Sequence, residues 1–448
     1  MPATAQPDTP LHENSCATQS SGGDYELEAV PQDKRRSFWS ITVVWTGYVF
    51  LITSMMAGGG LAQGMTMSEI IGATFAGNIF LSAVAVAISY IACKTGLTFA
   101  LITRHSFGVE GSRAASLFAP LINLGWYAIQ SALYGHLIAE IFGLSPAGEY
   151  VAMACSALVM GIFAIIGMEA LTVLGLVAIP AIIFLSIAAA MRAVAGVDGG
   201  MSAIMSMVPA ESMPWSKGVI LVIGTWIFSA ATCIADIMRY AKSVKDALLS
   251  ATIALVLGNS LLILCGAITA FAVNDSDLVN VLLKLGLVVP ALVLMTTNLF
   301  TTNATNLYSN ALGLANVFRK AGKRNIFIGM LAFAMLMTLT RPYRIDALFA
   351  FLNTLGTVVP PLPGIILADY FILKKGSYGP LSMCQNVKIN WNACAAWLVA
   401  TVLAFVIPYG LAPLNGIILG GAIYLGLNKI RPVECITATP AAGKGERV

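Results

Sequence analysis

The sequence contains very little charge. Only 10% of its 448 residues are Asp, Glu, Lys or Arg, whereas an average soluble domain is about one quarter charged. Hydrophobic residues make up 58% of the chain, and the mean hydropathy is +0.83. This composition excludes an ordinary soluble domain and indicates a protein that crosses the membrane many times.

Other features are missing as well. The first 37 residues have no apolar core before Trp39, which predicts a disordered tail and not a cleaved signal peptide. The eight cysteines include no C-x-x-C pair, and no set of His, Cys, Asp and Glu residues indicates a metal site or a catalytic acid and base. The sequence therefore predicts neither an enzyme nor a cofactor. The net charge of +4 predicts no nucleic-acid partner, because the basic residues are distributed by loop.

Long apolar segments run from Trp39 to about residue 428. Each span of a lipid membrane needs about 20 apolar residues folded as a helix, because hydrocarbon offers the backbone no hydrogen-bond partners. Twelve spans fit, and they define a transmembrane domain over residues 38–429 between tails at 1–37 and 430–448. The predicted spans are 39–62, 69–92, 114–142, 150–168, 171–193, 218–238, 247–273, 285–313, 325–340, 345–372, 391–409 and 411–429.

The basic residues predict the orientation. With the N-terminus in the cytoplasm, 20 of the 25 Lys and Arg residues fall in cytoplasmic segments and 5 in outer segments. Positive charge collects on the cytoplasmic side of membrane proteins. We therefore expect a multi-pass protein of the cell (inner) membrane with both termini in the cytoplasm.

Two spans that lie five apart share a local pattern. Residues 47–54 and 224–231 each place an aromatic residue and small hydroxyl residues after a glycine. The odd offset means that the two copies run in opposite directions, as in inverted repeats whose first helices are broken near the middle of the membrane. The alternative is that these small residues only allow close helix packing.

The predicted eighth span is rich in threonine and asparagine. Asn298, Thr301, Thr302 and Thr305 follow the i, i+3, i+4, i+7 spacing and share one helix face. Neutral oxygens at this density suit a weakly held monovalent cation, although such hydroxyls also bond to carbonyls of their own helix. Asn303 lies on a neighbouring face, within reach of a polar substrate.

The predicted third span carries an indole between two amides. Asn123 precedes Trp126 by one turn, and Gln130 follows it by one turn. A flat heteroaromatic ligand uses an aromatic face for stacking and amides for hydrogen bonds at its edge. Trp226 in the sixth span is a candidate for the ligand's other face. The alternative is that both tryptophans belong to the core or to the belt at the membrane surface.

Ionisable residues are few in the apolar segments. His136 and Glu140 are four residues apart near the outer end of the third span, and they form either a proton relay or a pair that reaches water. Asp236 and Arg239, at the inner end of the sixth span, form either a cytoplasmic gate or a pair that snorkels to the surface. Both alternatives stay open from the sequence alone.

Six motifs, taken in order, resemble one transporter family. They are KTGLTFALITRHSFGVEGS (94–112), LGWY (124–127), IADIMRY (234–240), LGNS (257–260), TTNATNLYSNALGLAN (301–316) and PPLPGIILADYF (360–371). They are similar to motifs of the nucleobase:cation symporters of the purine, cytosine and hydantoin group, and within it of the bacterial cytosine permeases. The resemblance extends from about residue 38 to residue 428.

This resemblance implies an all-α membrane protein of twelve transmembrane helices with a LeuT-type fold. Two inverted repeats of five helices, here about 39–193 and 218–372, are followed by two additional C-terminal helices, here about 391–429. The resemblance also implies sodium-coupled uptake by alternating access, with Na⁺ as a co-transported ion.

The resemblance assigns roles to individual residues. The implied sodium ligands are the carbonyls of Gly47 and Phe50 together with Asn298, Thr301 and Thr302. The nucleobase is expected between Trp126 and an aromatic residue of the sixth span, either Trp226 or Phe228, with Asn123, Ser229 and Asn303 at its edge.

Three positions depart from the cytosine-transporting relatives of this family. Asn123 stands where they have glutamine, Leu51 stands where they have phenylalanine, and one extra residue separates Gly224 from Ser229. The extra residue leaves both Trp226 and Phe228 as candidates for stacking. The shorter amide and the missing ring predict a wider pocket, which accepts a substituted or larger heterocycle at least as well as cytosine.

The sequence thus predicts a sodium-coupled symporter that imports cytosine or a closely related nucleobase-like heterocycle. The first alternative is a proton-coupled transporter of a related purine, hydantoin or hydroxymethylpyrimidine. The second is a passive channel, which differs from a symporter because it cannot accumulate its substrate against a gradient.

Overall fold

The computed structural model describes residue 25 and residues 28–166, 168–209, 211–317, 323–379, 381 and 387–433. These residues are almost entirely helical, and the only strand-like pairing among them is an isolated bridge between Arg36 and Ala241. The elements are η1 (Gln32–Lys34), α1 (Phe38–Val49), α2 (Thr53–Leu61), α3 (Met67–Thr95), α4 (Phe99–Phe107), α5 (Val109–Phe142), α6 (Pro146–Ile166), α7 (Met168–Ala195), α8 (Gly200–Ser206), α9 (Trp215–Ala231), α10 (Cys233–Met238), α11 (Val244–Thr252), η2 (Ile253–Asn259), α12 (Ser260–Val273), α13 (Leu278–Lys284), α14 (Val288–Val317), α15 (Lys323–Thr338), α16 (Ile345–Val358), α17 (Pro361–Leu367), η3 (Ala368–Leu373), α18 (Trp391–Val406) and α19 (Ala412–Ile430).

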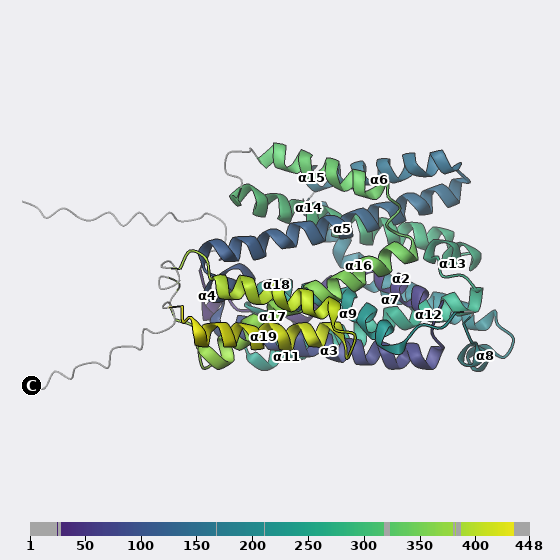
Figure 1. The fold of residues 1–448 in the computed structure, drawn as a ribbon. Helices are drawn as coiled ribbons and strands as arrows, with labels where there is room; N and C mark the ends of the chain where they lie inside the picture. Colours follow the sequence, from purple (N-terminus) through teal and green to yellow (C-terminus); the bar gives the residue numbers. More distant parts are fainter. Residues whose placement is uncertain are drawn as a thin grey trace, which may run out of the picture.

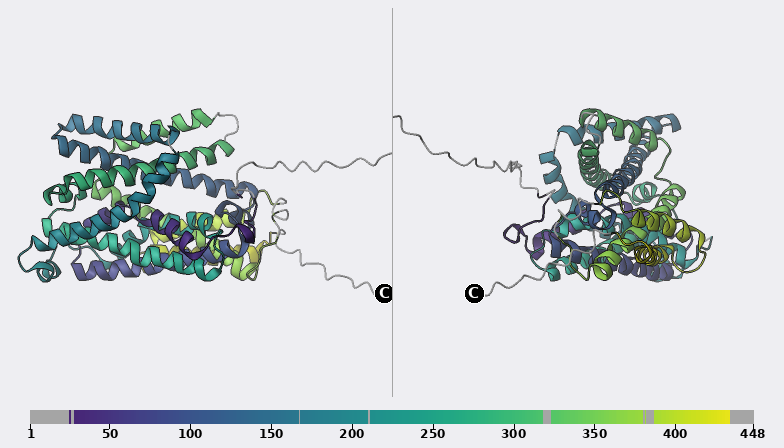
Figure 2. Two further views of the ribbon diagram at one scale, coloured as in Figure 1. Left: turned by 180° about the vertical axis from the view of Figure 1, so that it is seen from behind. Right: turned by 60° about the vertical axis from the view of Figure 1, so that its left-hand side comes forward.

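The long helices lie side by side in two layers (Figure 1). One layer contains α5, α6, α14 and α15, and every pair of these four helices is in contact. The other layer contains α1 to α3, α9 to α12 and α16 to α19, and both views in Figure 2 keep this division. Helix α7 contacts α14 in the first layer and α12 in the second. The boundary between the layers is where a ligand can lie among several helices.

Two glycines set how closely helices of the second layer approach. A Cβ atom at Gly58 of α2 would overlap the carbonyl of Ile263 in α12. A Cβ atom at Gly224 of α9 would overlap the carbonyl of Leu352 in α16. Small residues allow backbones to meet in this way in membrane helices, so both positions require glycine for packing.

Both spans that the sequence marked as broken are interrupted. Helices α1 and α2 are bent by 54° at a break over residues 50–52. Helices α9 and α10 are separated at Thr232, which leaves helical geometry with φ −131° and ψ −75°. The second break therefore lies after residues 224–231, and the expectation that it lies within them is wrong. These residues stay helical, and Gly224 lies at the close contact with α16.

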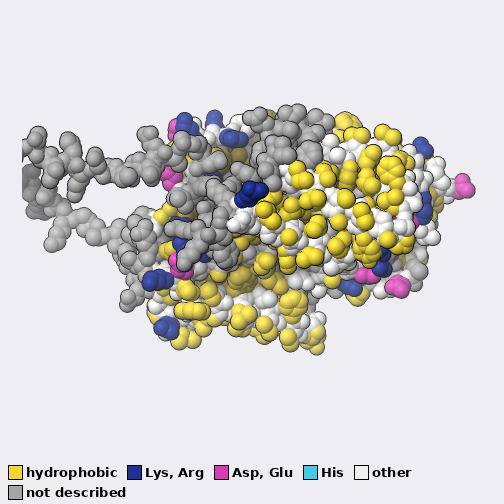
Figure 3. All heavy atoms as spheres, turned by 90° about the horizontal axis from the view of Figure 1, so that it is seen from above, with side chains coloured by type: hydrophobic (Ala, Val, Ile, Leu, Met, Phe, Trp, Pro, Cys, Tyr) yellow, Lys and Arg dark blue, Asp and Glu magenta, His cyan; other side chains and the backbone are white. Residues whose placement is uncertain are grey.

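Each predicted span coincides with one helix or with consecutive helices. Among the described residues, three continuous segments are long and apolar enough to cross a membrane: Met67–Thr95, Val244–Val273 and Ile345–Leu373. Counting two bent helix pairs as spans raises this number to five. Figure 3 shows hydrophobic side chains over the middle of one face and charged side chains toward its ends. The total of twelve spans stays a prediction.

The two ends of the molecule differ in their short elements. Helices α8 and α13 lie at one end, and α4 lies at the opposite end (Figure 1). The sequence predicts that α8 and α13 are outside the cell and that α4 is in the cytoplasm. The structure therefore separates the two predicted faces, while the assignment of each face to a side of the membrane rests on the basic residues.

The last residues of the expected N-terminal tail pack against the body. The N–H of Val30 donates to the carbonyl of Gly96 (3.0 Å), and the buried Arg35 donates to the carbonyl of Cys93 (2.6 Å). The disordered tail that the sequence predicts up to residue 37 is therefore wrong for residues 30–37. Residues 1–24 and 434–448 lie outside the described part of the chain.

Candidate functional site

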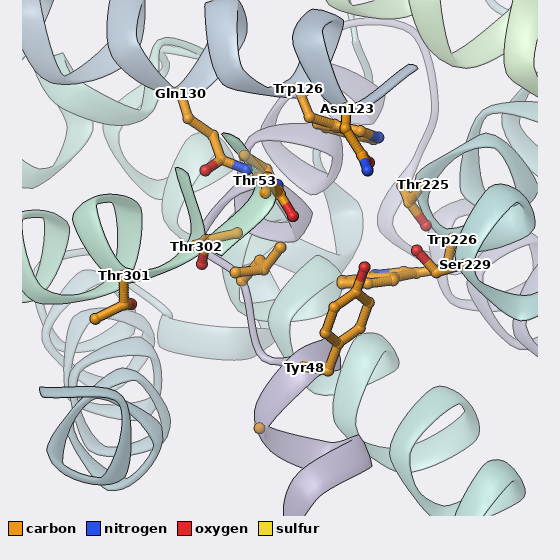
Figure 4. Close-up of a pocket in the computed structure, with 13 residues that line it drawn as sticks. Tyr48, Thr53, Asn123, Trp126, Gln130, Thr225, Trp226, Ser229, Thr301 and Thr302 are labelled. Atoms are coloured by element: carbon orange, nitrogen blue, oxygen red, sulfur yellow. The ribbon is translucent and has the colours of Figure 1, made fainter. Parts of the chain in front are cut away.

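A cavity of about 210 Å³ lies between the two layers. Drug-sized ligands occupy pockets of about 300–1,000 Å³, so this cavity suits one small heterocycle. In Figure 4 it is bounded by α5, by α1 and α2 around their break, by α9 and by α14. It brings together eight residues assigned from the sequence: Gly47, Leu51, Asn123, Trp126, Trp226, Ser229, Thr301 and Thr302.

The ring of Trp226 is held in place by buried polar groups. Its Nε1 donates to Asn259 Oδ1 (3.0 Å) and to Ser54 Oγ (3.3 Å). Asn259 in turn donates to Asn78 Oδ1 (2.7 Å), which belongs to α3. The ring of Tyr48 meets the indole edge-on, with centroids 5.8 Å apart. Because the indole N–H is already bonded, the ring can offer a ligand only its π surface.

Trp126 approaches the cavity from the other layer. It belongs to α5 and is half-buried, and its ring packs edge-to-face against Phe351 of α16 with centroids 5.2 Å apart. Figure 4 shows the two indoles on different walls of the cavity, one from α5 and one from α9. The two rings therefore provide two aromatic surfaces for one flat ligand.

Gln130 carries an unpaired acceptor at the cavity. Its side chain is 1% exposed, and its Oε1 has no hydrogen-bond partner among the described residues. It lies one turn after Trp126 and extends from α5 toward the cavity (Figure 4). A buried carbonyl without a partner costs about 1–3 kcal/mol. A ligand that brings an N–H group to Oε1 would remove this cost.

Asn123 is tied to the neighbouring helix. Its Nδ2 donates to Asn310 Oδ1 of α14 (3.1 Å), which leaves its own Oδ1 as the group that can face a ligand. Leu51 lies in the break after α1 and also lines the cavity. The structure therefore places two of the three departures from the cytosine-transporting relatives, Asn123 and Leu51, at the same pocket.

Asn298 joins α14 to the break between α1 and α2. Its Nδ2 donates to the carbonyl of Phe50 (3.2 Å), and its Oδ1 accepts from the N–H of Ile52 (3.3 Å). The side chain is 5% exposed, so both hydrogen bonds lie away from water. One amide thus satisfies two backbone groups that the break removes from helical pairing.

Thr301 and Thr302 lie beside this break. Thr302 Oγ1 donates to the carbonyl of Asn298 (2.8 Å), and Thr301 Oγ1 lies 2.7 Å from the carbonyl of Thr297. The hydroxyls therefore bond to their own helix, as one alternative expected. Each hydroxyl oxygen still has lone pairs for a cation. Together with carbonyls of the break, these neutral oxygens are a donor set that suits Na⁺, and their role as ligands stays a prediction.

The cavity carries no Asp, Glu, Lys, Arg or His among its lining residues. In the described part of the chain, no group of three or more His, Cys, Asp and Glu side chains could hold a metal ion. Charged groups are costly to bury without partners. An uncharged lining therefore suits an uncharged ligand.

Two residues assigned to the substrate do not reach the cavity. Asn303 is fully buried, and its Nδ2 faces the carbonyl of Tyr127 (3.2 Å) and Ser131 Oγ (3.1 Å) of α5. It follows Thr302 by one residue and thus points about 100° away around the helix. Phe228 is 3% exposed and packs in the core. The geometry corrects the placement of Asn303 and favours Trp226 over Phe228 for stacking.

Five lining residues were not assigned from the sequence: Tyr48, Thr53, Gln130, Thr225 and Asn306. The spacing of Gln130 from Trp126 was a usable signal, since residues four apart share a helix face. Asn306 follows Thr302 by the same spacing. Tyr48 and Thr53 flank the break, where helical periodicity does not apply.

Comparisons with known proteins show the family of this chain. The family described as "permease for cytosine/purines, uracil, thiamine, allantoin" matches residues 29–424. The chain belongs to this permease family. The cytosine permease of Escherichia coli O157:H7 is 33% identical over 411 residues, which cover 92% of this chain and 96% of that relative. The protein is therefore a membrane transporter and not an enzyme.

Solved structures of Mhp1 share the fold of this permease. The inward-facing conformation of Mhp1 has a TM-score of 0.79 and 20% identity, and the match covers 92% of this chain and 95% of that one. A closed conformation of Mhp1, a nucleobase-cation-symport-1 family transporter with bromovinylhydantoin bound, has a TM-score of 0.73 and 21% identity, with 92% and 96% covered. These likenesses confirm a helical transporter fold.

Proposed function

We propose that this permease is a sodium-coupled symporter that imports cytosine or a closely related nucleobase-like heterocycle by alternating access. The observation that carries the proposal is the small uncharged cavity lined by Trp126 and Trp226, with the unpaired Oε1 of Gln130 at its wall. A stacked base gains about 1–3 kcal/mol from an aromatic platform. The family description names nitrogen heterocycles, and Mhp1 was solved with a substituted hydantoin.

The break between α1 and α2 supports sodium as the coupling ion. The carbonyls of Gly47 and Phe50 and the oxygens of Asn298, Thr301 and Thr302 are the residues that would hold Na⁺. Bound there, the ion would supply positive charge to these carbonyl, amide and hydroxyl oxygens. Gly47, Thr301 and Thr302 also line the cavity, so a change in the shape of the break reaches the substrate pocket directly. Coupling of this kind is reciprocal: sodium raises substrate affinity by the factor by which substrate raises sodium affinity.

The alternative of proton coupling needs a titratable group whose charge changes with substrate binding. No lining residue is Asp, Glu or His. Because none of these side chains lines the cavity, we favour sodium over the proton as the ion that is transported with the substrate. A passive channel is disfavoured by the held ring of Trp226 and by the small volume, which indicate a binding site and not a continuous pore.

A binding panel on the purified protein tests the proposal. Melting temperature is measured with cytosine, uracil, hydantoins, purines and hydroxymethylpyrimidine, each with sodium and with potassium in its place. A ligand that binds the folded state raises its apparent stability, and we expect this rise to be larger with sodium for at least one compound. Equal shifts in both salts would refute sodium coupling.

Uptake into proteoliposomes separates the transport mechanisms. We expect the bound heterocycle to accumulate when a sodium gradient is imposed and the proton gradient is dissipated. Accumulation driven only by a proton gradient would instead establish the first alternative. Equilibration that never exceeds the outside concentration under either gradient would establish a channel.

A further inference from the structure

A second polar cluster lies away from the cavity, at the end of the molecule that carries α13. His136 of α5 is at its centre and is 7% exposed. Its Nδ1 lies 3.1 Å from Glu149 Oε1 in α6, and its Nε2 lies 3.2 Å from Asp277 Oδ2, in the residue before α13. One imidazole therefore connects carboxylates from two other elements. The expected pairing with Glu140 is not among these contacts.

Both carboxylates also interact with groups other than His136. Burial raises the pKa of Asp277, but the contact with His136 and the backbone N–H groups of Asn280 and Val279 outweigh it, so the pKa lies below its ordinary value. Glu149 Oε2 accepts from Arg341 (2.7 Å). Glu149 Oε1 also accepts from the hydroxyl of Tyr343 (2.5 Å).

The negative charge of these two carboxylates determines how many protons the imidazole of His136 needs in order to bond to both. An ionised carboxylate can only accept hydrogen bonds, whereas neutral imidazole has one N–H and one lone pair. With a carboxylate at each nitrogen, a neutral ring turns its lone pair toward one negative oxygen. The bridge is therefore attractive on both sides only when the ring carries two protons.

The remaining charged groups around His136 are also defined. Glu140 lies one turn further along α5 and adds negative charge. Asp275 is paired with Lys284 at 2.7 Å, and the guanidinium of Arg341 lies 4.5 Å from the ring centre of Tyr150. The ring of Tyr343 stacks on His136 with centroids 4.5 Å apart. The carboxylates of Glu140, Glu149 and Asp277 thus surround the imidazole, and Arg341 offsets only the charge of Glu149.

Helix α13 is the element that this bridge can hold or release. It is a short helix between α12 and α14, and it packs against α2, α5, α12 and α14. Its N-cap is Asp277, whose Oδ1 accepts from the N–H of Val279 (2.9 Å) and of Asn280 (3.3 Å). The carboxylate that caps α13 therefore also joins it to His136 of α5, and through that ring to α6.

We propose that His136 is a proton-binding site that latches α13 onto α5 and α6. With the ring protonated, the latch is closed. With the ring neutral, a lone pair faces Asp277 or Glu149 and the latch is weakened. The contact of α13 with α5 and α6 is therefore stabilised at acid pH. This stabilisation is lost as the pH rises through and above the ordinary histidine pKa of about 6.5. The latch itself does not depend on the proposed function, whereas its effect on uptake does.

The other histidine in the described residues, His105, is not expected to gain or lose a proton over the same pH range. His105 lies at the opposite end, in α4, stacked on Tyr378 with ring centroids 4.0 Å apart. Burial, together with the charge of Lys374, lowers the pKa of His105 to about 4. His105 therefore stays neutral across the range in which His136 is expected to titrate.

Hydrogen exchange of the α13 backbone tests the latch on the full-length protein without ligand. Protection of the amides of residues 278–284 is measured from pH 6 to pH 8.5, after correction for the pH dependence of unprotected amides. Couplings between sites typically change an equilibrium by about 5- to 150-fold, so we expect protection in the parent protein to fall by about fivefold or more. The pH range should have no such effect in His136→Gln.

A second variant keeps the test decisive if His136→Gln does not fold. Asp277→Ser removes the carboxylate at Nε2 but retains a good N-cap for α13, and we expect its protection not to depend on pH. Asp275→Asn is the matched control, because it removes the pair with Lys284 on the same loop and leaves Asp277 in place, so the pH dependence should remain. Parent protein without pH dependence, or Asp277→Ser with the parent's pH dependence, would overturn the latch.

Uptake distinguishes this inference from the proposed function. Parent and Asp277→Ser are compared in proteoliposomes while the pH on the α13 side is varied, and we expect a pH-dependent rate only in the parent. If exchange depends on pH as expected but no compound of the panel binds, the proposed function fails and the latch stands. If a heterocycle binds and exchange does not depend on pH, the latch fails alone.

Discussion

Replacing Gln130 by leucine should separate ligand affinity from stability. Leucine removes the unpaired Oε1 from a site that is 1% exposed, and an unpaired buried polar group costs about 1–3 kcal/mol. The melting temperature should therefore stay the same or rise. A ligand that donates to Oε1 then meets an apolar side chain and loses about 1–3 kcal/mol, which is a roughly 5- to 150-fold weaker dissociation constant.

Asn303 provides the matched comparison on the facing helix. Its Nδ2 donates to the carbonyl of Tyr127 and to Ser131 Oγ outside the cavity, and its Oδ1, like Oε1 of Gln130, has no partner among the described residues. Asn303→Leu therefore also removes an unpaired buried acceptor, but outside the cavity, so it should leave the dissociation constant within about twofold. Calorimetric titration and thermal unfolding on the same preparations give the dissociation constant and the melting temperature. Unchanged affinity in Gln130→Leu together with lost affinity in Asn303→Leu would refute the placement of the ligand.

Three further variants address the coupling ion, the stacking surface and the substrate. Thr302→Ala should raise the sodium concentration for half-maximal uptake without changing substrate preference. Thr297 is the control position, because its hydroxyl bonds to carbonyls of α14 away from the cavity, and Thr297→Ala should leave this sodium concentration unchanged. Equal effects of the two variants would remove Thr302 from the ion site. Trp126→Ala should weaken ligand binding by about 5- to 150-fold, and parent-like affinity in a folded variant would exclude stacking. Asn123→Gln combined with Leu51→Phe should shift competition for uptake toward cytosine, because both changes narrow the cavity. If the parent already prefers cytosine at least tenfold and the double variant ranks the compounds of the panel in the same order, the argument from pocket size is contradicted.

Local spacing was a good guide wherever a helix stays regular. Trp126 and Asn123 line the cavity as expected because residues three or four apart share a face of α5. The same helical spacing also predicted that Thr301 and Thr302 of α14 share a face, and both line the cavity. It also gave Gln130 as the second amide beside the indole, but the family resemblance assigned a role only to Asn123.

Spacing failed where contacts between helices decide the outcome. Asn303 was expected at the substrate because it lies near the middle of its span, but Ser131 and Tyr127 of α5 take its amide. The break in the sixth span was expected at the glycine of residues 224–231, and it lies at Thr232. The partners of Asn303 lie far away in the sequence, so no local pattern indicates them.

The sequence by itself determined that this is a membrane protein, that it resembles nucleobase transporters, and that polar oxygens and two tryptophans are concentrated in a few spans. Those conclusions depend on composition and on short-range periodicity, which the order of residues contains directly. Only the tertiary structure decided that Gln130 has an unpaired acceptor, that Asn298 holds the break of α1 and that His136 lies between two carboxylates from other elements. The physical reason is that hydrogen bonding and charge pairing depend on distances of about 3 Å between groups, and the packing of helices remote in the sequence sets those distances.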